Sequence, residues 1–393
     1  MATRAAVAGI GQTRYAKNIG RTEVDLACEA IRNACADAGL PVAAVDGFVS
    51  YHIEQVAEVE LITTLGIPEL RFMARTPSGG GGAASLLGLA ALAVASGTAE
   101  CVVAFRSRNR SKAASYGADP NQGGRPWAKA DARLADNSQW SRPFGMIRPV
   151  DEIAMLTRRY MYEYGATRQH LANVALAFRS HANRNPVATM YHKPLTREQY
   201  LDARWISEPL CLFDNCLETD GALAVVITSA ERARDLASTP AYVHAFAQGI
   251  PPQHQTMTNF FTDDPLRGPA WACASRLWTN ADVGPADVKV AQLYDAFSPL
   301  IPLSLEGYGF CARGEGGPFT DDGALEWPNG RLPTNTAGGG MSEAYVHGFN
   351  LVLEGVRQIR GTSTSQVEDA DVSLVTSGEG VPTSALLLTA DAS

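Results

Sequence analysis

The chain has 393 residues, of which 46% are hydrophobic and 19% are charged, as in an ordinary globular protein. Its length exceeds that of a typical single hydrophobic core, so we expect two domains or two fused halves. The net charge of -8 argues against a nucleic-acid-binding function, which needs a clustered basic face. The sequence shows no leader pattern and no apolar run of membrane-spanning length, which predicts a cytoplasmic protein outside the membrane.

Cysteine and histidine spacing gives no sign of a metal site. The seven cysteines contain no CxxC pair, and an odd number of scattered cysteines is typical of reduced, buried thiols rather than of a disulfide or zinc framework. The seven histidines also lack the spacing of metal ligands. We therefore predict no metal site.

The first hundred residues alternate between strand and helix patterns, and a Gly-rich turn begins at Ser78. Small apolar residues at Ala5–Ile10 predict a central strand, and the spacing of apolar residues over Val24–Ala38 predicts a helix that Gly39 ends. The remaining predicted elements are a strand ending at 49, a helix at 56–65, a small-residue helix reaching 95 and a strand at 101–105.

The same order of elements recurs in the last third of the chain. The predicted elements there are a helix at 270–278, a strand ending at 294, a helix from about 298, a Gly-rich turn at 338–340, a helix reaching 359 and a strand from 372. This shared plan indicates an internal duplication, with two similar α/β layers packed about a pseudo-twofold axis.

The stretch Leu332–Gly348 contains a glycine triplet, Gly338–Gly340, which meets Ser342 and Glu343 at the predicted start of an apolar helix. Glycine allows the backbone to approach a ligand closely, and a helix N-terminus offers N–H groups to a developing negative charge. The stretch therefore resembles the floor of an active site. The alternative, a packing corner before a helix, stays open at this point.

Residues 106–204 form a polar region with two amphipathic helices, at 152–164 and 168–183, and we interpret it as an insertion that covers a site. A solvated loop is the favoured interpretation of its basic start, and contact with substrate phosphates is the alternative. The basic residues are Arg106, Arg108, Arg110 and Lys112. After it, the turn at Asp220-Gly221 and a strand at 224–228 return to the first core. The predicted domains are 1–105 with 205–235, 106–204, and 236–393.

Several ordered motifs carry a resemblance to a known family. They are GIGQTRY at 9–15, RYMYEYGATRQHLANVALAFRSHANRNPVA at 159–188, TDGALAVVITSAERA at 219–233, YDAF at 294–297 and NTAGGG at 335–340. With them the chain resembles the thiolase superfamily, and most closely its sterol-carrier-protein or lipid-transfer-protein branch. The resemblance implies an α/β fold of duplicated βαβαβαββ halves in a five-layered sandwich, with a loop domain over a coenzyme A thioester.

The reactive groups of a thiolase are absent at the positions that match. The first Gly-rich turn, Thr76–Ser85, and the last, Thr376–Pro382, contain no cysteine, while the family's catalytic histidine and asparagine fall on Tyr345 and Tyr294. Claisen chemistry without a thiolate is disfavoured. The loss of cysteine together with a tyrosine pair resembles the steroid side-chain-cleaving aldolases. That implies retro-aldol cleavage of a β-hydroxyacyl-CoA, such as 17-hydroxy-3-oxo-pregn-4-ene-20-carboxyl-CoA, to a 17-keto steroid and propionyl-CoA.

This resemblance and the residues together define the candidate site. Tyr294 and Tyr345 are the expected proton-transfer pair, although each could instead be a packing aromatic residue. Backbone N–H groups in the Gly-rich turns are expected to stabilise the thioester enolate. No lysine for a Schiff base lies in these turns, and no tightly bound cofactor is expected beyond the coenzyme A of the substrate. The glycine candidates are Gly80, Gly81, Gly378 and Gly380, and the weaker side-chain candidates are Ser78, Asp295 and His347.

The resemblance also implies partners. It implies a homodimeric core and a small OB-fold partner protein, often with a zinc ribbon, in a heterotetramer. Aromatic residues in the insertion, Trp127, Trp140 and Tyr191, are weak candidates for contact with it. Two other functions stay open: a thiolase or acyltransferase that uses Ser78 or one of the cysteines, and a lipid-binding scaffold without catalysis.

Overall fold

Strand β1 (Ala5–Gln12) lies in the middle of a nine-stranded sheet of order β3-β2-β4-β7-β1-β8-β11-β10-β9. The computed structural model describes residues 4–76, 79–109, 141–254, 257 and 260–391. Side chains of a strand point alternately to its two faces, so Ala5 and Val7 enter one hydrophobic core while Ala6 and Ala8 enter the other. This burial on both faces confirms the predicted central strand.

The strands and helices follow the predicted order closely. The remaining strands are β2 (Gly47–Tyr51), β3 (Phe72–Thr76), β4 (Cys101–Arg108), β5 (Trp205–Ser207), β6 (Leu210–Cys211), β7 (Gly221–Ser229), β8 (Ala241–Gly249), β9 (Val290–Gln292), β10 (Val372–Thr376) and β11 (Thr383–Thr389). The helices are α1 (Glu23–Ala38), α2 (Glu58–Leu65), α3 (Ala83–Ala95), α5 (Pro149–Tyr164), α6 (Arg168–Ala182), α7 (Arg197–Leu201), α8 (Ala230–Arg234), α9 (Pro269–Asn280), α10 (Leu300–Gly307), α11 (Gly316–Phe319), α12 (Gly339–Ser342) and α13 (Phe349–Arg360).

The strand ladders confirm the internal duplication. In the first half, β2 runs parallel to β4, and β7 pairs antiparallel with both β4 and β1. In the second half, β9 runs parallel to β10, and β11 pairs antiparallel with both β10 and β8. The parallel neighbour β3 also has a counterpart, because Ala291 forms a parallel bridge with Thr334. Two residue pairs between β1 and β8 join the halves.

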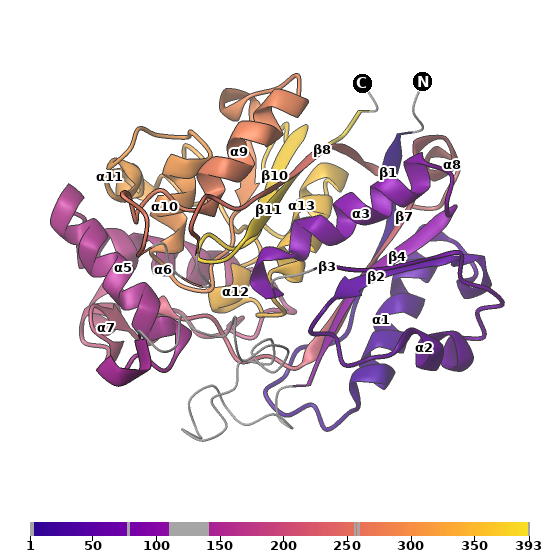
Figure 1. Cartoon of the computed structure of the whole chain (residues 1–393), viewed down its shortest axis with the longest axis horizontal. Helices are drawn as coiled ribbons and strands as arrows, with labels where there is room; N and C mark the ends of the chain where they lie inside the picture. Colours follow the sequence, from indigo (N-terminus) through magenta and orange to yellow (C-terminus); the bar gives the residue numbers. More distant parts are fainter. Residues whose placement is uncertain (1–3, 77–78, 110–140, 255–256, 258–259, 392–393) are drawn as a thin grey trace.

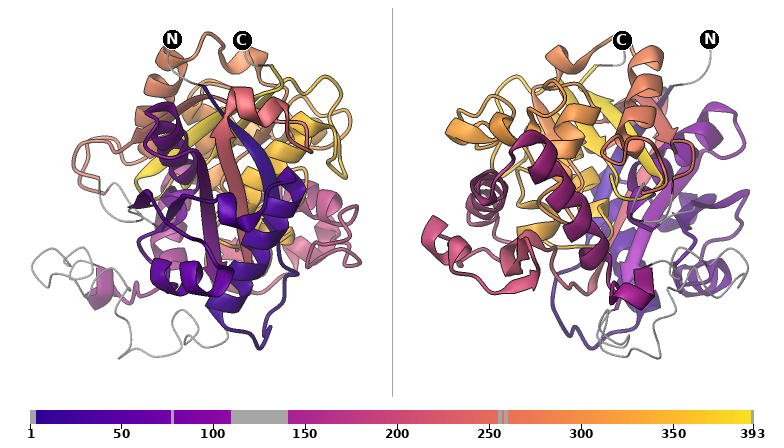
Figure 2. Two further views of the ribbon diagram at one scale, coloured as in Figure 1. Left: turned by 90° about the vertical axis from the view of Figure 1, so that its right-hand side faces the viewer. Right: turned by 60° about the vertical axis from the view of Figure 1, so that its left-hand side comes forward.

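Helices and strands alternate in five layers, as the sequence analysis expected. Helix α1 packs on β1, β7 and β4, helices α3 and α13 lie between the two halves of the sheet, and α9 covers β8 and β11 on the far side (Figure 1). The side views show the strands running through the middle of the molecule, with helices on both sides of them (Figure 2). The Gly-rich turns of the two halves precede α3 and α13, so the duplication brings both turns to the middle of the molecule.

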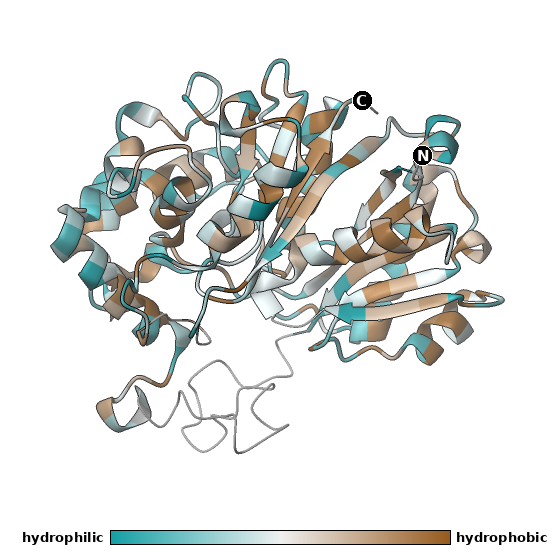
Figure 3. Ribbon diagram, turned by 45° about the horizontal axis from the view of Figure 1, so that its top comes forward, coloured by the Kyte–Doolittle hydropathy of each residue, from teal (hydrophilic) through white to brown (hydrophobic). Residues whose placement is uncertain are grey.

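Hydrophobic residues line the strands and the buried helix α3, while the outward faces of the peripheral helices are more polar (Figure 3). Strands β4 and β7 carry apolar residues toward both faces and are buried along nearly their whole length. Such continuous apolar strands are expected when helices cover both faces of a sheet. No helix in the described part of the chain is long and apolar enough to span a membrane.

Helices α5, α6 and α7 of the insertion lie beside the second half (Figure 1). Helix α6 packs on α12, where the Arg179 Nε–H donates to Ser342 Oγ (3.1 Å) and the Asn185 side chain donates to the carbonyl of Ala337 (3.1 Å). The insertion therefore holds the Gly-rich turn of the second half from outside. The division of the chain into three domains remains a prediction.

The helix predicted to begin near Ser342 is interrupted, and this expectation was wrong. Helix α12 ends at Ser342, and α13 begins only at Phe349. Between them His347 has φ +53° and Gly348 has φ +79°, which lie in the left-handed region and break a right-handed helix. The irregular segment 343–348 carries Tyr345, so the break determines where that side chain lies.

Candidate active site

Three Gly-rich turns meet at the centre of the molecule. They are residues 79–82 before α3, residues 338–340 at α12, and residues 377–382 between β10 and β11. The N–H of Gly378 donates to the carbonyl of Gly80 (3.1 Å), and the hydroxyls of Ser377 and Ser384 accept hydrogen bonds from the N–H groups of Ala84 and Ser85. The first turn of α3 is thus capped by residues of the opposite half of the duplicated fold.

Tyr294 and Tyr345 meet at this junction, and their hydroxyl oxygens lie 2.5 Å apart. Tyr294 follows the end of β9, and its N–H donates to Thr376 Oγ1 (3.1 Å). Tyr345 lies between α12 and α13, and its N–H donates to Thr219 Oγ1 (3.0 Å). Each tyrosine backbone is therefore fixed by a threonine from another segment, and the two side chains share one short hydrogen bond.

Glycines surround the ring of Tyr294 on three sides. A Cβ atom at Gly80 would lie 1.9 Å from the Tyr294 hydroxyl oxygen, and one at Gly348 would lie 2.8 Å from the ring carbon Cδ2. A Cβ atom at Gly378 would lie 3.1 Å from Cε1. These distances fall at or below the shortest contacts of real Cβ atoms, so the tyrosine ring occupies space that these glycines leave open.

Burial raises the pKa of Tyr294 well above its usual value of 10, and the neighbouring Tyr345 raises it further. A phenolate in this position would lose its hydration without a cation as hydrogen-bond partner. Tyr294 therefore keeps its proton throughout the neutral pH range. The pair consists of one fully buried phenol, Tyr294, and one half-buried phenol, Tyr345.

Asp295 binds the backbone of the predicted active-site floor. Its carboxylate accepts hydrogen bonds from the N–H of Gly340 (2.8 Å) and of Met341 (3.1 Å). Complete burial raises the pKa of Asp295 to about 7, while these N–H donors lower it. The N–H groups that we expected to face a substrate thus bind a carboxylate of the protein itself, and Asp295 holds the turn rather than the tyrosine hydroxyls.

Ser342 and Glu343, also named from the sequence, have structural contacts. Ser342 Oγ accepts from Arg179, as described above, and the Glu343 carboxylate accepts from the Asn350 side chain (3.1 Å). Burial raises the pKa of Glu343 to about 8, although Arg357 opposes this effect. Both residues connect the turn to its surroundings.

The glycines proposed as enolate donors differ in their positions. Gly80 and Gly378 both border Tyr294, but the N–H of Gly378 already donates to Gly80, so the geometry does not support an oxyanion role for it. Gly81 packs against the carbonyl of Pro382, and Gly380 faces Ile153 of α5 and Met257. Gly80 is therefore the candidate closest to the tyrosine pair. Ser78 lies outside the described residues.

The site contains two arginines that we had assigned to a solvated loop. Arg106 and Arg108 end strand β4 and are only 4% and 6% exposed, so this interpretation was wrong for them. The Arg108 guanidinium lies over the Tyr345 ring, 5.5 Å from its centroid. Arg110 and Lys112 lie outside the described residues. A positive charge on a strand end is not distinguishable from a loop charge in the sequence alone.

His347 is buried beside Tyr345, with the two ring centroids 5.6 Å apart and the rings nearly perpendicular. The Arg106 Nε–H donates to His347 Nδ1 (3.1 Å), and Arg106 also forms an ion pair with Glu54 (2.8 Å). His347 was a weak candidate from the sequence, whereas Arg106 and Glu54 were missed as site residues. No local motif in the sequence links them, because they come from separate segments.

Cys216 was also missed. Cys216 is half-buried and lies near the tyrosine pair, because a negative charge on its thiol would raise the pKa of Tyr294. The N–H of Cys216 donates to the carbonyl of Ala296 (2.9 Å). Burial raises the pKa of the other six thiols, which makes them poor nucleophiles. These six are Cys28, Cys35, Cys101, Cys211, Cys273 and Cys311.

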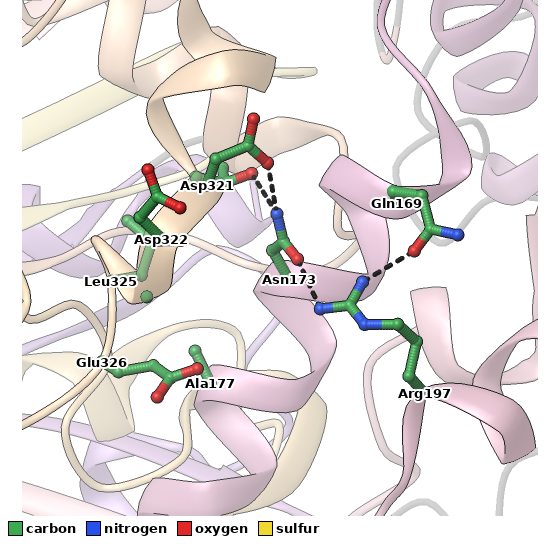
Figure 4. A pocket seen from close by; sticks show the side chains of 10 residues that line it. Gln169, Asn173, Ala177, Arg197, Asp321, Asp322, Leu325 and Glu326 are labelled. Atoms are coloured by element: carbon green, nitrogen blue, oxygen red, sulfur yellow. Dashed lines mark hydrogen bonds between the residues drawn. The ribbon is translucent and has the colours of Figure 1, made fainter.

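A separate surface pocket of about 460 Å³ lies between α6 and residues 320–326 (Figure 4), and neither Tyr294 nor Tyr345 lines it. Arg197 crosses it and donates to the side chains of Gln169 and Asn173, each at 2.7 Å. Asp321, Asp322 and Glu326 line the opposite side. These carboxylates would repel the phosphates of coenzyme A, so the pocket does not extend the candidate site.

Comparison with known proteins places this geometry in context. Residues 253–389 match the family described as thiolase C-terminal domain-like. The chain is 45% identical to the 17-hydroxy-3-oxo-4-pregnene-20-carboxyl-CoA lyase of Mycobacterium tuberculosis, over 98% of this chain and 99% of the relative. It is also 45% identical to a steroid side-chain-cleaving aldolase of Thermomonospora curvata, over 98% of each chain. A solved structure of an Ltp2-ChsH2(DUF35) aldolase matches with a TM-score of 0.92 and 44% identity, covering 100% of this chain and 99% of the other.

Proposed function

Since the chain belongs to the thiolase superfamily, and within it to the branch of the steroid side-chain-cleaving aldolases, we propose that it is a carbon–carbon lyase acting on coenzyme A thioesters. Its substrate is a steroid with a β-hydroxyacyl-CoA side chain, such as 17-hydroxy-3-oxo-pregn-4-ene-20-carboxyl-CoA. Its products are the 17-keto steroid and propionyl-CoA. The observation that carries this proposal is the hydrogen-bonded pair of Tyr294 and Tyr345 among Gly-rich turns that lack a cysteine.

The reaction divides into two proton transfers around one bond cleavage. Tyr345 reacts as a phenolate: it takes the proton of the steroid 17-hydroxyl, the bond between C17 and C20 breaks, and the electrons of that bond pass into the thioester as an enolate. Tyr294, which burial keeps protonated, gives its proton to C20 and so releases propionyl-CoA. The direct hydrogen bond between the tyrosines then returns a proton from Tyr345 to Tyr294, which restores the starting state.

Two groups support this division of labour. The Arg108 guanidinium over the Tyr345 ring attracts the electrons of the ring face, while the Tyr294 hydroxyl donates to any negative charge on the Tyr345 oxygen. The enolate oxygen needs donors of its own, and the backbone at Gly80, the glycine next to the Tyr294 hydroxyl, is the position that we favour.

The test is cleavage of a synthetic steroid β-hydroxyacyl-CoA by this chain co-expressed with a DUF35-type partner. We expect 17-keto steroid and propionyl-CoA in equal amounts, and a fall in kcat of about 10²-fold or more in Tyr294→Phe and in Tyr345→Phe. Tyr242→Phe, on β8 and outside the site, serves as the matched control and should keep full activity. Full activity in both site variants would exclude the tyrosine mechanism.

The same assay separates the two rival functions. A thiolase or acyltransferase that used Cys216 would form an acyl-enzyme and lose activity in Cys216→Ser, whereas the lyase should retain cleavage in that variant. A lipid-binding scaffold would bind the steroid thioester without any turnover, and both tyrosine variants would bind it equally well. Cleavage that depends on the tyrosines and survives Cys216→Ser excludes the scaffold and a nucleophilic role of Cys216.

We also propose that the chain acts together with a partner protein. The similar solved structure is that of an Ltp2-ChsH2(DUF35) aldolase, and we propose that this chain likewise works with a small DUF35-type partner, an OB-fold protein with a zinc ribbon, around a homodimeric core in the cytoplasm. Tyr191, expected at the surface, is half-buried against His192, while Trp127 and Trp140 lie outside the described residues. Size-exclusion chromatography with light scattering of the co-purified proteins would show whether they form a heterotetramer.

A further inference from the structure

We propose that Arg106 is a positioning residue for the reaction, which fixes the imidazole of His347 as the neutral tautomer with its proton on Nε2. The structural part of this inference stands on contacts within this chain, and only its kinetic consequence rests on the proposed lyase activity. It also assigns His347 a role: the imidazole is a hydrogen-bond donor in the site and not a base.

The contact between the two residues determines the tautomer. Arg106 Nε lies 3.1 Å from His347 Nδ1, and both side chains are buried. An arginine side chain remains protonated and has donors only, so its partner nitrogen must accept. His347 Nδ1 therefore carries no proton, and the single proton of the neutral ring is on Nε2.

Arg106 is itself held in place. Its Nη1 group pairs with Glu54 Oε2 at 2.8 Å, and the same carboxylate oxygen accepts from the N–H of Ser107 (3.0 Å). The side chain of Glu54 is fully buried and that of Arg106 is 5% exposed. A buried pair with this geometry leaves the guanidinium little freedom to turn, so its Nε–H stays directed at the imidazole.

The backbone of His347 is held as firmly as its ring. The residue has φ +53°, and its carbonyl accepts a hydrogen bond from the hydroxyl of Tyr51 (3.1 Å) at the end of β2. Its ring lies edge-to-face with that of Tyr345. The imidazole thus connects a buried ion pair on one side to a proposed catalytic phenol on the other. Within the described residues, the charged and titratable groups near it include Tyr51, Glu54, Arg106, Arg108 and Tyr345.

Protonation of His347 would need an N–H on Nδ1, which would point at the Arg106 Nε–H. Two donors facing each other, beside a guanidinium charge, oppose this state strongly. His347 therefore stays neutral where an ordinary histidine would titrate, near pH 6.5. During the reaction it cannot take the substrate proton, which leaves the proton transfers to the two tyrosines.

The first test reads the tautomer directly and needs no substrate. The full chain is labelled with ¹⁵N in its imidazole rings, and the His347 signals are assigned by their loss in His347→Asn, because Asn tolerates the positive φ. We expect an unprotonated Nδ1 and a protonated Nε2 from pH 5.5 to 8. In Arg106→Met combined with Glu54→Gln, which removes both buried charges, His347 Nδ1 should become protonated at a higher pH than in the wild type.

The second test is the pH dependence of kcat/KM for the lyase reaction. Wild type should show no inflection from His347, whereas the Arg106→Met/Glu54→Gln variant should gain one as His347 becomes able to take a proton, and should lose about tenfold or more in kcat/KM. Arg75→Gln is the matched control. Arg75 donates to the carbonyls of Glu54 and Val56, so this variant loosens the same segment without touching His347 and should gain no inflection.

The outcomes are distinct. A wild-type His347 that titrates near pH 6.5, or that carries its proton on Nδ1, overturns the inference, and so does a double variant whose His347 spectrum is unchanged. If the spectra behave as expected but the chain cleaves no steroid thioester, the proposed function fails while the tautomer assignment stands. An inflection in the Arg75→Gln profile would show that loosening of the segment, and not Arg106, controls His347.

Discussion

At the scale of one residue, Gly348 leaves the space that the Tyr294 ring occupies. Its φ of +79° favours a residue without a Cβ atom, and a Cβ atom there would also lie only 2.8 Å from the Tyr294 ring. Gly361, at the other end of α13, has a similar φ of +71° and open space around it. A substitution at Gly361 therefore introduces backbone strain alone, whereas one at Gly348 introduces the same strain and also displaces the tyrosine.

We expect Gly361→Ala to lower the free energy of unfolding by about 1–2 kcal/mol and to leave kcat unchanged, because it introduces strain alone. Gly348→Ala should cost at least as much stability and also lower kcat by about 10²-fold, since a shift of 1 Å in a reacting group has an effect of this size. Urea unfolding and the cleavage assay measure the two quantities. Equal kcat values for the two variants would contradict the argument.

The site could be predicted only in part, and its residues show why. Tyr294 and Tyr345 were identified because they occupy motif positions of a known family, and the structure brings their hydroxyls together. Their catalytic role stays a prediction. The roles of Arg106 and Asp295 depend on contacts between distant segments, which no local pattern records. Arg106 looks like any other loop arginine in the sequence, and Asp295 looks like a partner for its neighbour Tyr294.

At the scale of elements, the turn between β10 and β11 joins helix α9 through Glu379. This buried carboxylate accepts a hydrogen bond from the N–H of Ala270 (2.6 Å), in the first turn of α9. Burial raises the pKa of Glu379 to about 8, and the nearby Glu306 adds to this, while the N–H of Ala270 lowers it. The connection between turn and helix therefore depends on pH.

The sign of this dependence follows from the raised pKa. The folded protein binds the Glu379 proton more tightly than the unfolded chain, so this stabilisation is complete below about pH 4 and is lost as pH rises toward 8. One such group changes the free energy of unfolding by up to about 1.4 kcal/mol per pH unit. We expect stability measured by urea unfolding to fall from pH 5 to pH 8.5.

Glu379→Gln should reduce that fall, because the amide keeps an oxygen for the N–H of Ala270 but does not ionise. Glu231→Gln, which removes an exposed carboxylate on α8, is the control and should leave the slope as in wild type. Parallel slopes for wild type and Glu379→Gln would show that Glu379 does not titrate in this range.

At the scale of the whole molecule, hydrogen bonds between strands account for only part of the contact between the two halves. Only two residue pairs join β1 to β8, so much of the union depends on α3, which packs on strands of both halves. Gly88 on α3 lies against the ring of Phe246 on β8, where a Cβ atom would come within 2.3 Å of the ring.

Gly88→Ala tests this contact. Alanine favours a helix over glycine by about 1 kcal/mol, but crowding of a packed interface costs about 1–3 kcal/mol, so we expect a net loss of about 1–2 kcal/mol in unfolding free energy. Leu92→Ala, at an exposed position of the same helix, should change it by less than about 0.5 kcal/mol. A more stable Gly88→Ala variant would show that the interface between the halves can accommodate an additional methyl group.

The overall architecture was more predictable than the site because it rests on patterns that repeat. Periodicity over Val24–Ala38 and the repeated order of elements gave both halves, and most helix ends agree within a few residues. The break at 343–348 was not predictable, since apolar residues continue through it at helical spacing and the positive φ of His347 has no sequence signal. Tertiary contacts of Tyr345 and His347 override the local helix preference there.

The contact between Gly80 and Tyr294 limits the routes by which such a site can evolve. With only 1.9 Å between a Cβ atom at position 80 and the tyrosine hydroxyl, any side chain at this position of the first Gly-rich turn would require the Tyr294 ring to shift. No single substitution at position 80 can add a nucleophile while the tyrosine stays in place. A lineage that changes from one chemistry to the other must therefore move or replace Tyr294 when it fills position 80.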